Sequence, residues 1–155
     1  MQNATVIAIQ LHQAHGQPMQ PVSQARGLLD QGLEGDSHSL RGPGRRRQVL
    51  LLDRSTLDRF GLQPGDLREQ ITITGWPDIS LLPPGTRLRV GDLTLEASGP
   101  CEPCQHIGEL LGVEDPEAFR QALQQSRGLL CRVVDVQDEG WVRVGDRVEL
   151  LAVTP

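Results

Sequence analysis

The chain has 155 residues, a length typical of one domain with a single hydrophobic core. It carries 15 basic and 20 acidic residues, and the net charge of −5 argues against a general binder of nucleic acids or other polyanions. Every basic residue is an arginine, so lysine-based Schiff-base chemistry and a P-loop are excluded.

The first fifteen residues lack the basic start and the apolar run of a signal peptide. The longest apolar runs, such as 49–52, are far shorter than the roughly 20 residues that a membrane helix requires. Three cysteines are an odd number, which indicates reduced thiols rather than a disulfide framework. We therefore expect a soluble cytoplasmic protein that binds neither membranes nor nucleic acids.

Most of the chain predicts short strands separated by turns of Gly, Pro and Asp. Two similar segments, 87–96 and 141–150, each predict a pair of alternating strands that meet at a Val-Gly-Asp corner, a repeated barrel-building device. In chain order the predicted strands cover 5–9, 48–52, 70–74, 86–90, 93–97, 129–136, 141–144 and 147–153.

Helices are expected to be few and short. One is predicted over 53–60 and ends at Gly61. Another begins at Asp115, a good N-cap, with Pro116 at its first position and Glu117 near its positive end. The predicted fold class is mainly β (α+β), a closed barrel of mostly antiparallel strands with a few short helices, forming one domain over 1–155.

The segment G-P-C-E-P-C-Q-H-I-G, residues 99–108, allows three kinds of site. A C-x-x-C pair followed by a helix resembles a dithiol redox site, although the flanking strands are not of the βαβ type. A Cys₃His zinc site would use Cys101, Cys104, His106 and Cys131, with unusual spacing. Alternatively, Cys104 is a single functional thiolate in a loop that Pro100 and Pro103 stiffen, suited to a soft metal or to sulfur transfer. The periodicity of the sequence does not discriminate among these three kinds of site.

Three motifs, in this order along the chain, favour the third alternative, a single functional thiolate at Cys104. They are G-L-E-G-D-S-H at 32–38, G-D-L-R-E-Q at 65–70 and G-P-C-E-P-C at 99–104, the last preceded by L-P-P-G-T-R-L-R-V-G-D-L-T-L-E. Together, over about residues 27–145, they resemble the MOSC family, the molybdenum-cofactor sulfurase C-terminal domain. The resemblance implies a β-barrel that receives the molybdenum cofactor, with Cys104 at the family's cysteine position as molybdenum ligand or sulfur carrier. Cys131 is expected to be an ordinary core thiol.

The resemblance also implies roles for residues outside the cysteine motif. Asp36 and His38 match the family's G-D-x-H stretch, and Glu69 matches a family glutamate; with Cys104 they form the expected catalytic set. Gln70 replaces the usual asparagine, and Cys101 stands where many relatives carry another residue. An alternative for 36–38 is structural, an Asx turn at Asp36 with His38 on the surface.

Arg41 and Arg47 belong to the one cluster of positive charge in the sequence, residues 39–48, and one or the other is a candidate to hold the cofactor phosphate. Cys101, Cys104 and Gln70 complete the expected cofactor-binding set. Pyridoxal phosphate is rejected because the chain has no lysine. The expected function is a molybdenum-dependent reductase of N-hydroxylated or N-oxygenated small molecules that takes electrons from a partner protein. The alternative is a carrier that delivers sulfur or cofactor to another enzyme.

Overall fold

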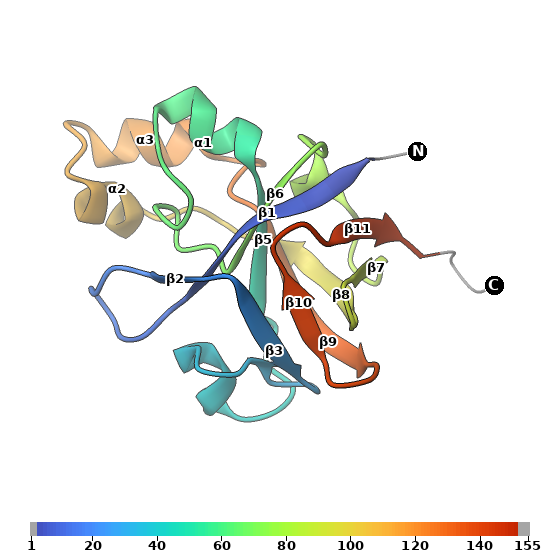
Figure 1. Cartoon of the computed structure of the whole chain (residues 1–155). Coiled ribbons are helices and arrows are strands. Elements are labelled where there is room, and N and C mark those ends of the chain that lie inside the picture. Colours follow the sequence, from blue (N-terminus) through green and yellow to red (C-terminus); the bar gives the residue numbers. More distant parts are fainter. Residues whose placement is uncertain (1–2, 152–155) are drawn as a thin grey trace.

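The computed structural model describes residues 3–151 as a closed seven-stranded barrel (Figure 1). Around the barrel the strands follow the order β11-β7-β8-β9-β5-β6-β1, and β1 pairs with β11 to close it. Every neighbouring pair is antiparallel except β5 and β6, which run parallel. The barrel strands are β1 (Ala4–Leu11), β5 (Val49–Asp53), β6 (Ile71–Thr74), β7 (Arg87–Val90), β8 (Leu93–Pro100), β9 (Leu129–Val136) and β11 (Arg147–Leu150).

Four shorter strands extend this frame. The hairpin strand β2 (Gln20–Val22) pairs with the end of β1. A separate three-stranded sheet joins β10 (Trp141–Arg143), β3 (Gln24–Leu28) and β4 (Gly32–Leu33). The predicted corner at 90–92 is a hairpin turn between β7 and β8, whereas β10 and β11 enter different sheets, so the second Val-Gly-Asp corner is not a hairpin.

Three short helices gather on one side of the barrel, as Figure 1 shows: α1 (Arg54–Phe60), α2 (Gln105–Leu111) and α3 (Pro116–Ala122). The Asp53 carboxylate caps α1 by accepting a hydrogen bond from the Ser55 N–H at 2.9 Å, and Gly61 ends it in the left-handed region. Asp115 caps α3 in the same way through the Ala118 N–H. The predicted helices are therefore confirmed.

Two hydrophobic cores share the central strand β5. All five residues of β5 are buried, because one face points into the barrel and the other lies under the helices. Leu51 belongs to the barrel core, whereas its neighbour Leu52 packs with Leu57, Phe119 and Leu123 beneath α1 and α3. This second core fixes the helices against the barrel wall and so determines where the loop before α2 lies.

The predicted mainly β barrel with short helices is thus confirmed, and most predicted strands lie where expected. The strand predicted over 147–153 ends at Leu150, and its residues after 151 lie outside the described part of the chain. Within residues 3–151, no helix has both the length and the apolar character needed to cross a bilayer.

Candidate functional site

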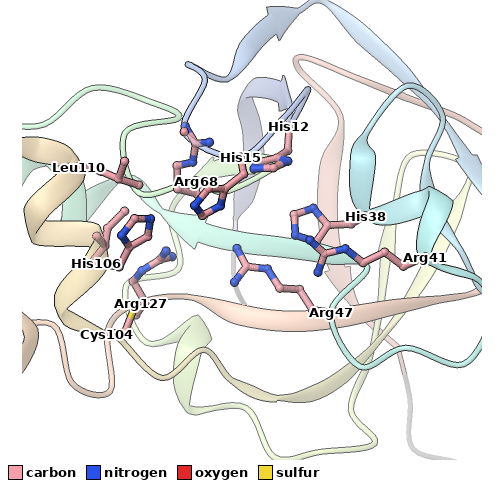
Figure 2. Close-up of a pocket in the computed structure, with 12 residues that line it drawn as sticks. His12, His15, His38, Arg41, Arg47, Arg68, Cys104, His106, Leu110 and Arg127 are labelled. Carbon is pink, nitrogen blue, oxygen red and sulfur yellow. The ribbon is translucent and has the colours of Figure 1, made fainter.

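A pocket of about 220 Å³ opens between the barrel and α2 (Figure 2). This volume is below the roughly 300–1,000 Å³ of pockets that enclose a drug-sized ligand, so it would surround only part of such a ligand. The lining contains all four histidines of the chain, four arginines and one cysteine, and none of these described lining residues is acidic. They are His12, His15, Gly16, His38, Arg41, Arg47, Arg68, Cys104, His106, Ile107, Leu110 and Arg127.

Cys104 is the exposed thiol of this pocket. It directly precedes α2, and Figure 2 shows its sulfur beside the Arg127 side chain. Cys101 is buried just before it, and its N–H donates to the Gly128 carbonyl at 2.9 Å, which ties this loop to the segment that carries Arg127. Cys101 and Cys104 are both free thiols.

Cys131 is not part of the pocket. It lies on β9 inside the barrel core, where complete burial raises the pKa of its thiol. The prediction that Cys131 is an ordinary core thiol is confirmed. Over residues 3–151 no three His, Cys, Asp or Glu side chains are arranged to hold a metal ion, so the Cys₃His zinc alternative has no geometric support.

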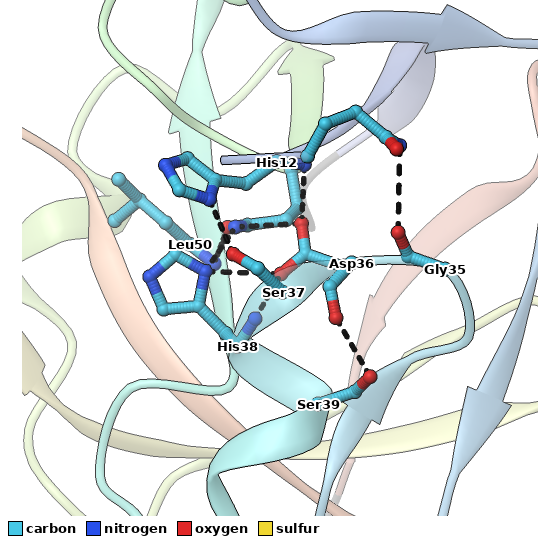
Figure 3. A network of polar contacts seen from close by, with 9 residues as sticks. His12, Gly35, Asp36, Ser37, His38, Ser39 and Leu50 are labelled. Carbon is cyan, nitrogen blue, oxygen red and sulfur yellow. Dashed lines mark hydrogen bonds and ion pairs between the residues drawn. The ribbon is translucent and has the colours of Figure 1, made fainter. Parts of the chain in front are cut away.

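His38 is held by a buried carboxylate behind the pocket (Figure 3). The Asp36 Oδ1 lies 2.9 Å from the His38 Nδ1 and also accepts the His38 backbone N–H at 2.9 Å. Its Oδ2 accepts from the His12 N–H at 2.6 Å and from the Gln70 Nε2 at 3.2 Å. With Nδ1 donating to the carboxylate, the His38 Nε2 is the nitrogen left for a ligand.

This arrangement distinguishes between the functional and the structural interpretation of residues 36–38. Asp36 does form the Asx-type turn, but His38 is only 5% exposed, so the alternative of a surface histidine is wrong. Burial alone raises the pKa of Asp36, and hydrogen bonds from His38 and from two backbone N–H groups outweigh it and hold the pKa below 3.8. The carboxylate is therefore ionised at neutral pH.

The other histidines add two ring contacts. His12 packs edge-on against His38 with 4.9 Å between ring centroids, and its Nδ1 contacts the Ser37 hydroxyl. Burial, followed by the nearby charges of His38 and Arg68, lowers the pKa of His12, which favours its neutral form. His15 stacks on His106 at 5.2 Å, which links the loop after β1 to α2.

Three lining arginines carry buried nitrogens without a hydrogen-bond partner among the described residues: Nε of Arg47, Nη2 of Arg68 and Nη1 of Arg127. Arg127 is only 5% exposed, and burial lowers the pKa of its guanidinium. Guanidinium N–H groups are strong donors to anions, so three such groups around one pocket give it the chemistry of an anion-binding site. Figure 2 shows these three side chains converging on the same space.

The structure brings some of the predicted site residues to the pocket. Cys104, His38, Arg41 and Arg47 line it. Asp36 and Gln70 lie directly behind His38. Glu69 is fully buried and Cys101 nearly so, and neither lines the pocket.

Sequence reasoning missed four polar lining residues, His12, His15, Arg68 and Arg127, and considered His106 only as a ligand of the zinc alternative. Arg68 lies inside the motif G-D-L-R-E-Q and could have been considered there. The others are isolated in the sequence, and nothing in their spacing brings them together.

Comparison with known proteins agrees with this picture. The family model of the MOSC domain matches residues 38–149. The YuaD protein from Bacillus subtilis has the same fold, with a TM-score of 0.80 and 19% identity, covering 98% of this chain and 97% of that one. YiiM from Escherichia coli gives a TM-score of 0.68 at 19% identity, with 97% of this chain and 71% of that one covered. No curated protein matches the chain.

Proposed function

The chain belongs to the MOSC domain family, and we propose that its pocket binds the molybdenum cofactor, with Cys104 as the sulfur that contacts molybdenum. The observation that carries this proposal is one exposed thiol in a pocket that is otherwise lined mainly by arginine and histidine. A cysteine sulfur is a soft ligand suited to such a metal centre.

The residues present fit the phosphate of that cofactor. Arg47, Arg68 and Arg127 each offer a buried N–H that has no partner in the described chain. Guanidinium groups bind phosphate through short, charge-assisted hydrogen bonds. We assign the phosphate to these three residues and not to Arg41, which the sequence offered as the alternative to Arg47.

The proposed activity is the reduction of an N-hydroxylated small molecule. The bound cofactor would supply the oxygen-accepting metal. In the overall reaction the N–O bond of R–NHOH breaks, two electrons and two protons are taken up, and R–NH₂ and water form. His38 would deliver a proton from its Nε2, while Asp36 fixes the ring through Nδ1. Asp36 does not line the pocket and is a positioning residue; Gln70, bonded to Asp36, supports the same ring. Glu69, which bonds Thr72, does not line the pocket either.

The two electrons would come from a donor protein. We propose that the reaction takes place in the cytoplasm, where the three free thiols would stay reduced.

A second candidate function is that of a carrier that passes sulfur or cofactor to a partner enzyme. The exposure of Cys104 favours it because a partner can reach the thiol. Steady turnover with an external electron donor would support the reductase, and a single stoichiometric transfer the carrier.

Metal analysis tests the property that both candidate functions share, the binding of molybdenum through Cys104. Protein made in a host that synthesises the cofactor should contain molybdenum, and Cys104→Ser should lose most of it. Cys131→Ala, which removes a thiol from the barrel core, is the matched control and should keep the metal. Molybdenum that persists in Cys104→Ser, or that is missing from the wild type, would contradict the proposal.

A further inference from the structure

From the charges around the pocket we infer that its substrate carries an oxyanion, a phosphate monoester or a carboxylate, and that Arg41 binds this group. The inference rests on the proposed function and adds a substrate class to it. It begins from the imbalance of the lining, which has four arginines and, among its described residues, no acid.

The acids near the pocket do not line it, and Glu69 among them is fully buried. Asp36 is 1% exposed and accepts hydrogen bonds from His12, His38 and Gln70. Glu109 lies 3.8 Å from the His106 imidazole, and its own side chain is 61% exposed outside the lining. A cationic substrate would therefore meet four guanidinium groups and no carboxylate in the lining, whereas an anionic one would meet partners.

Arg41 is placed where a substrate held by His38 can reach it. Both residues belong to the 3₁₀ turn Ser37–Arg41, three positions apart. Side chains at i and i+3 of a 3₁₀ helix lie on the same side, and both line the pocket. Figure 2 shows Arg41 beside His38, on the far side of Arg47 from Cys104.

Arg41 also differs from the other three arginines. It is exposed, and within residues 3–151 its guanidinium makes no hydrogen bond or ion pair, while its carbonyl accepts from Arg45. Arg47, Arg68 and Arg127, with their buried nitrogens, are assigned to the cofactor phosphate, which leaves Arg41 as the fourth guanidinium of the lining. The exposed rim position makes Arg41 the residue left for the substrate.

A matched series of substrates tests this on the cofactor-loaded protein. The series is N4-hydroxycytidine, its 5′-monophosphate, its 5′-carboxylate and its cationic 5′-amino-5′-deoxy analogue, assayed with a reduced viologen dye. We expect a KM about tenfold lower for at least one oxyanion than for the nucleoside, as one added charge-assisted contact provides, and the weakest binding for the cation. Calorimetric titration with unreactive cytidine 5′-monophosphate measures the same preference, against cytidine, without turnover.

Two arginine variants test whether Arg41 makes the contact with the oxyanion. Arg41→Gln should bring the ratio of the two KM values, and of the two dissociation constants, close to one. Arg46→Gln, an exposed arginine of the same segment that bonds the Ser98 carbonyl and does not line the pocket, should keep the ratio. Equal affinity of nucleoside and both oxyanions in molybdenum-loaded wild type, or a ratio unchanged in Arg41→Gln, overturns the inference. A wild type without molybdenum instead overturns the proposed function.

Discussion

Two buried carboxylates near the pocket lie in opposite electrostatic environments. Both oxygens of Asp36 accept hydrogen bonds, and the pKa of its carboxyl lies below 3.8. Glu69 is fully buried; its Oε2 accepts from the Thr72 hydroxyl at 2.8 Å, but Oε1 has no partner among the described residues. Burial raises the pKa of Glu69 above 4.5. One carboxylate is thus stabilised in its charged form and the other is not.

Exchanging each carboxylate for an amide should therefore have opposite effects on stability. Asp36→Asn places an NH₂ group against donors and should lower the free energy of unfolding by about 2–3 kcal/mol at pH 7. That difference should shrink as the pH falls from 3.8 through the lowered pKa of the folded state, because the unfolded wild-type chain takes up this proton more readily. Glu69→Gln should be at least as stable as the wild type at pH 7, because the buried charge is gone.

The pH dependence separates the two cases. The wild type should lose stability relative to Glu69→Gln as the pH rises from 4.5 through the raised pKa of the folded state, since the unfolded chain gives up this proton more easily. Urea unfolding between about pH 3 and 8 measures both differences. A Glu69→Gln variant that is clearly less stable than the wild type at pH 7 and more stable near pH 4 would contradict this assignment.

At the residue level the sequence identified the groups that belong to motifs. Cys104, Asp36 and His38 were found because their order and neighbours resemble a family pattern. Arg127 and His12 were not, since a single arginine or histidine between apolar strands has no distinctive spacing. Arg127 reaches the pocket only because Pro100 on β8 pairs with Leu129 on β9, a long-range register that local patterns do not contain.

At the level of elements, Gly128 fixes the start of β9 and with it Arg127. Its φ is +108°, its N–H donates to the Ser80 hydroxyl at 3.0 Å, and a Cβ at this position would lie 2.6 Å from the Leu51 carbonyl oxygen. A side chain here would be strained by its backbone conformation and would also collide with β5.

Gly128→Ala should therefore be much more destabilising than an alanine at a glycine of similar conformation. Gly85 has a φ of +90°, and a Cβ there would meet no other atom within 4 Å, so Gly85→Ala should cost only the backbone strain, about 1–2 kcal/mol. We expect Gly128→Ala to cost at least about 2 kcal/mol more, as overpacking does, and to lower molybdenum content. Equal losses in urea unfolding would show that β9 can move away from β5.

The elements that the sequence predicted are those with strong local signals. Alternating apolar strands and the caps at Asp53 and Asp115 are examples. The strands β2, β3 and β4 were missed because their sequences, Q-P-V, Q-A-R-G-L and G-L, are short and largely polar or small. They form through pairing with distant partners, β3 with β10 across more than a hundred residues.

For the whole molecule, the charge of the pocket and the charge of the chain have opposite signs. The net charge is −5, so the residues other than the four lining arginines carry −9. A small anion that enters the pocket meets the arginines at contact distance, where solvent screens little. A polyanion would have to lie along the acidic remainder of the surface as well.

This distribution predicts that the protein binds small oxyanions and not nucleic acids. In fluorescence anisotropy at about 0.1 M salt, a DNA duplex of about 20 base pairs should show no binding at protein concentrations up to about 10 µM, a range in which non-specific DNA-binding proteins commonly bind. Cytidine 5′-monophosphate should still bind the same preparation in calorimetry, and about 0.3 M salt should weaken it only severalfold, since few charges are paired. Duplex binding with a steep salt dependence would mean that the arginines form an extended surface, and the discrete pocket would no longer explain their arrangement.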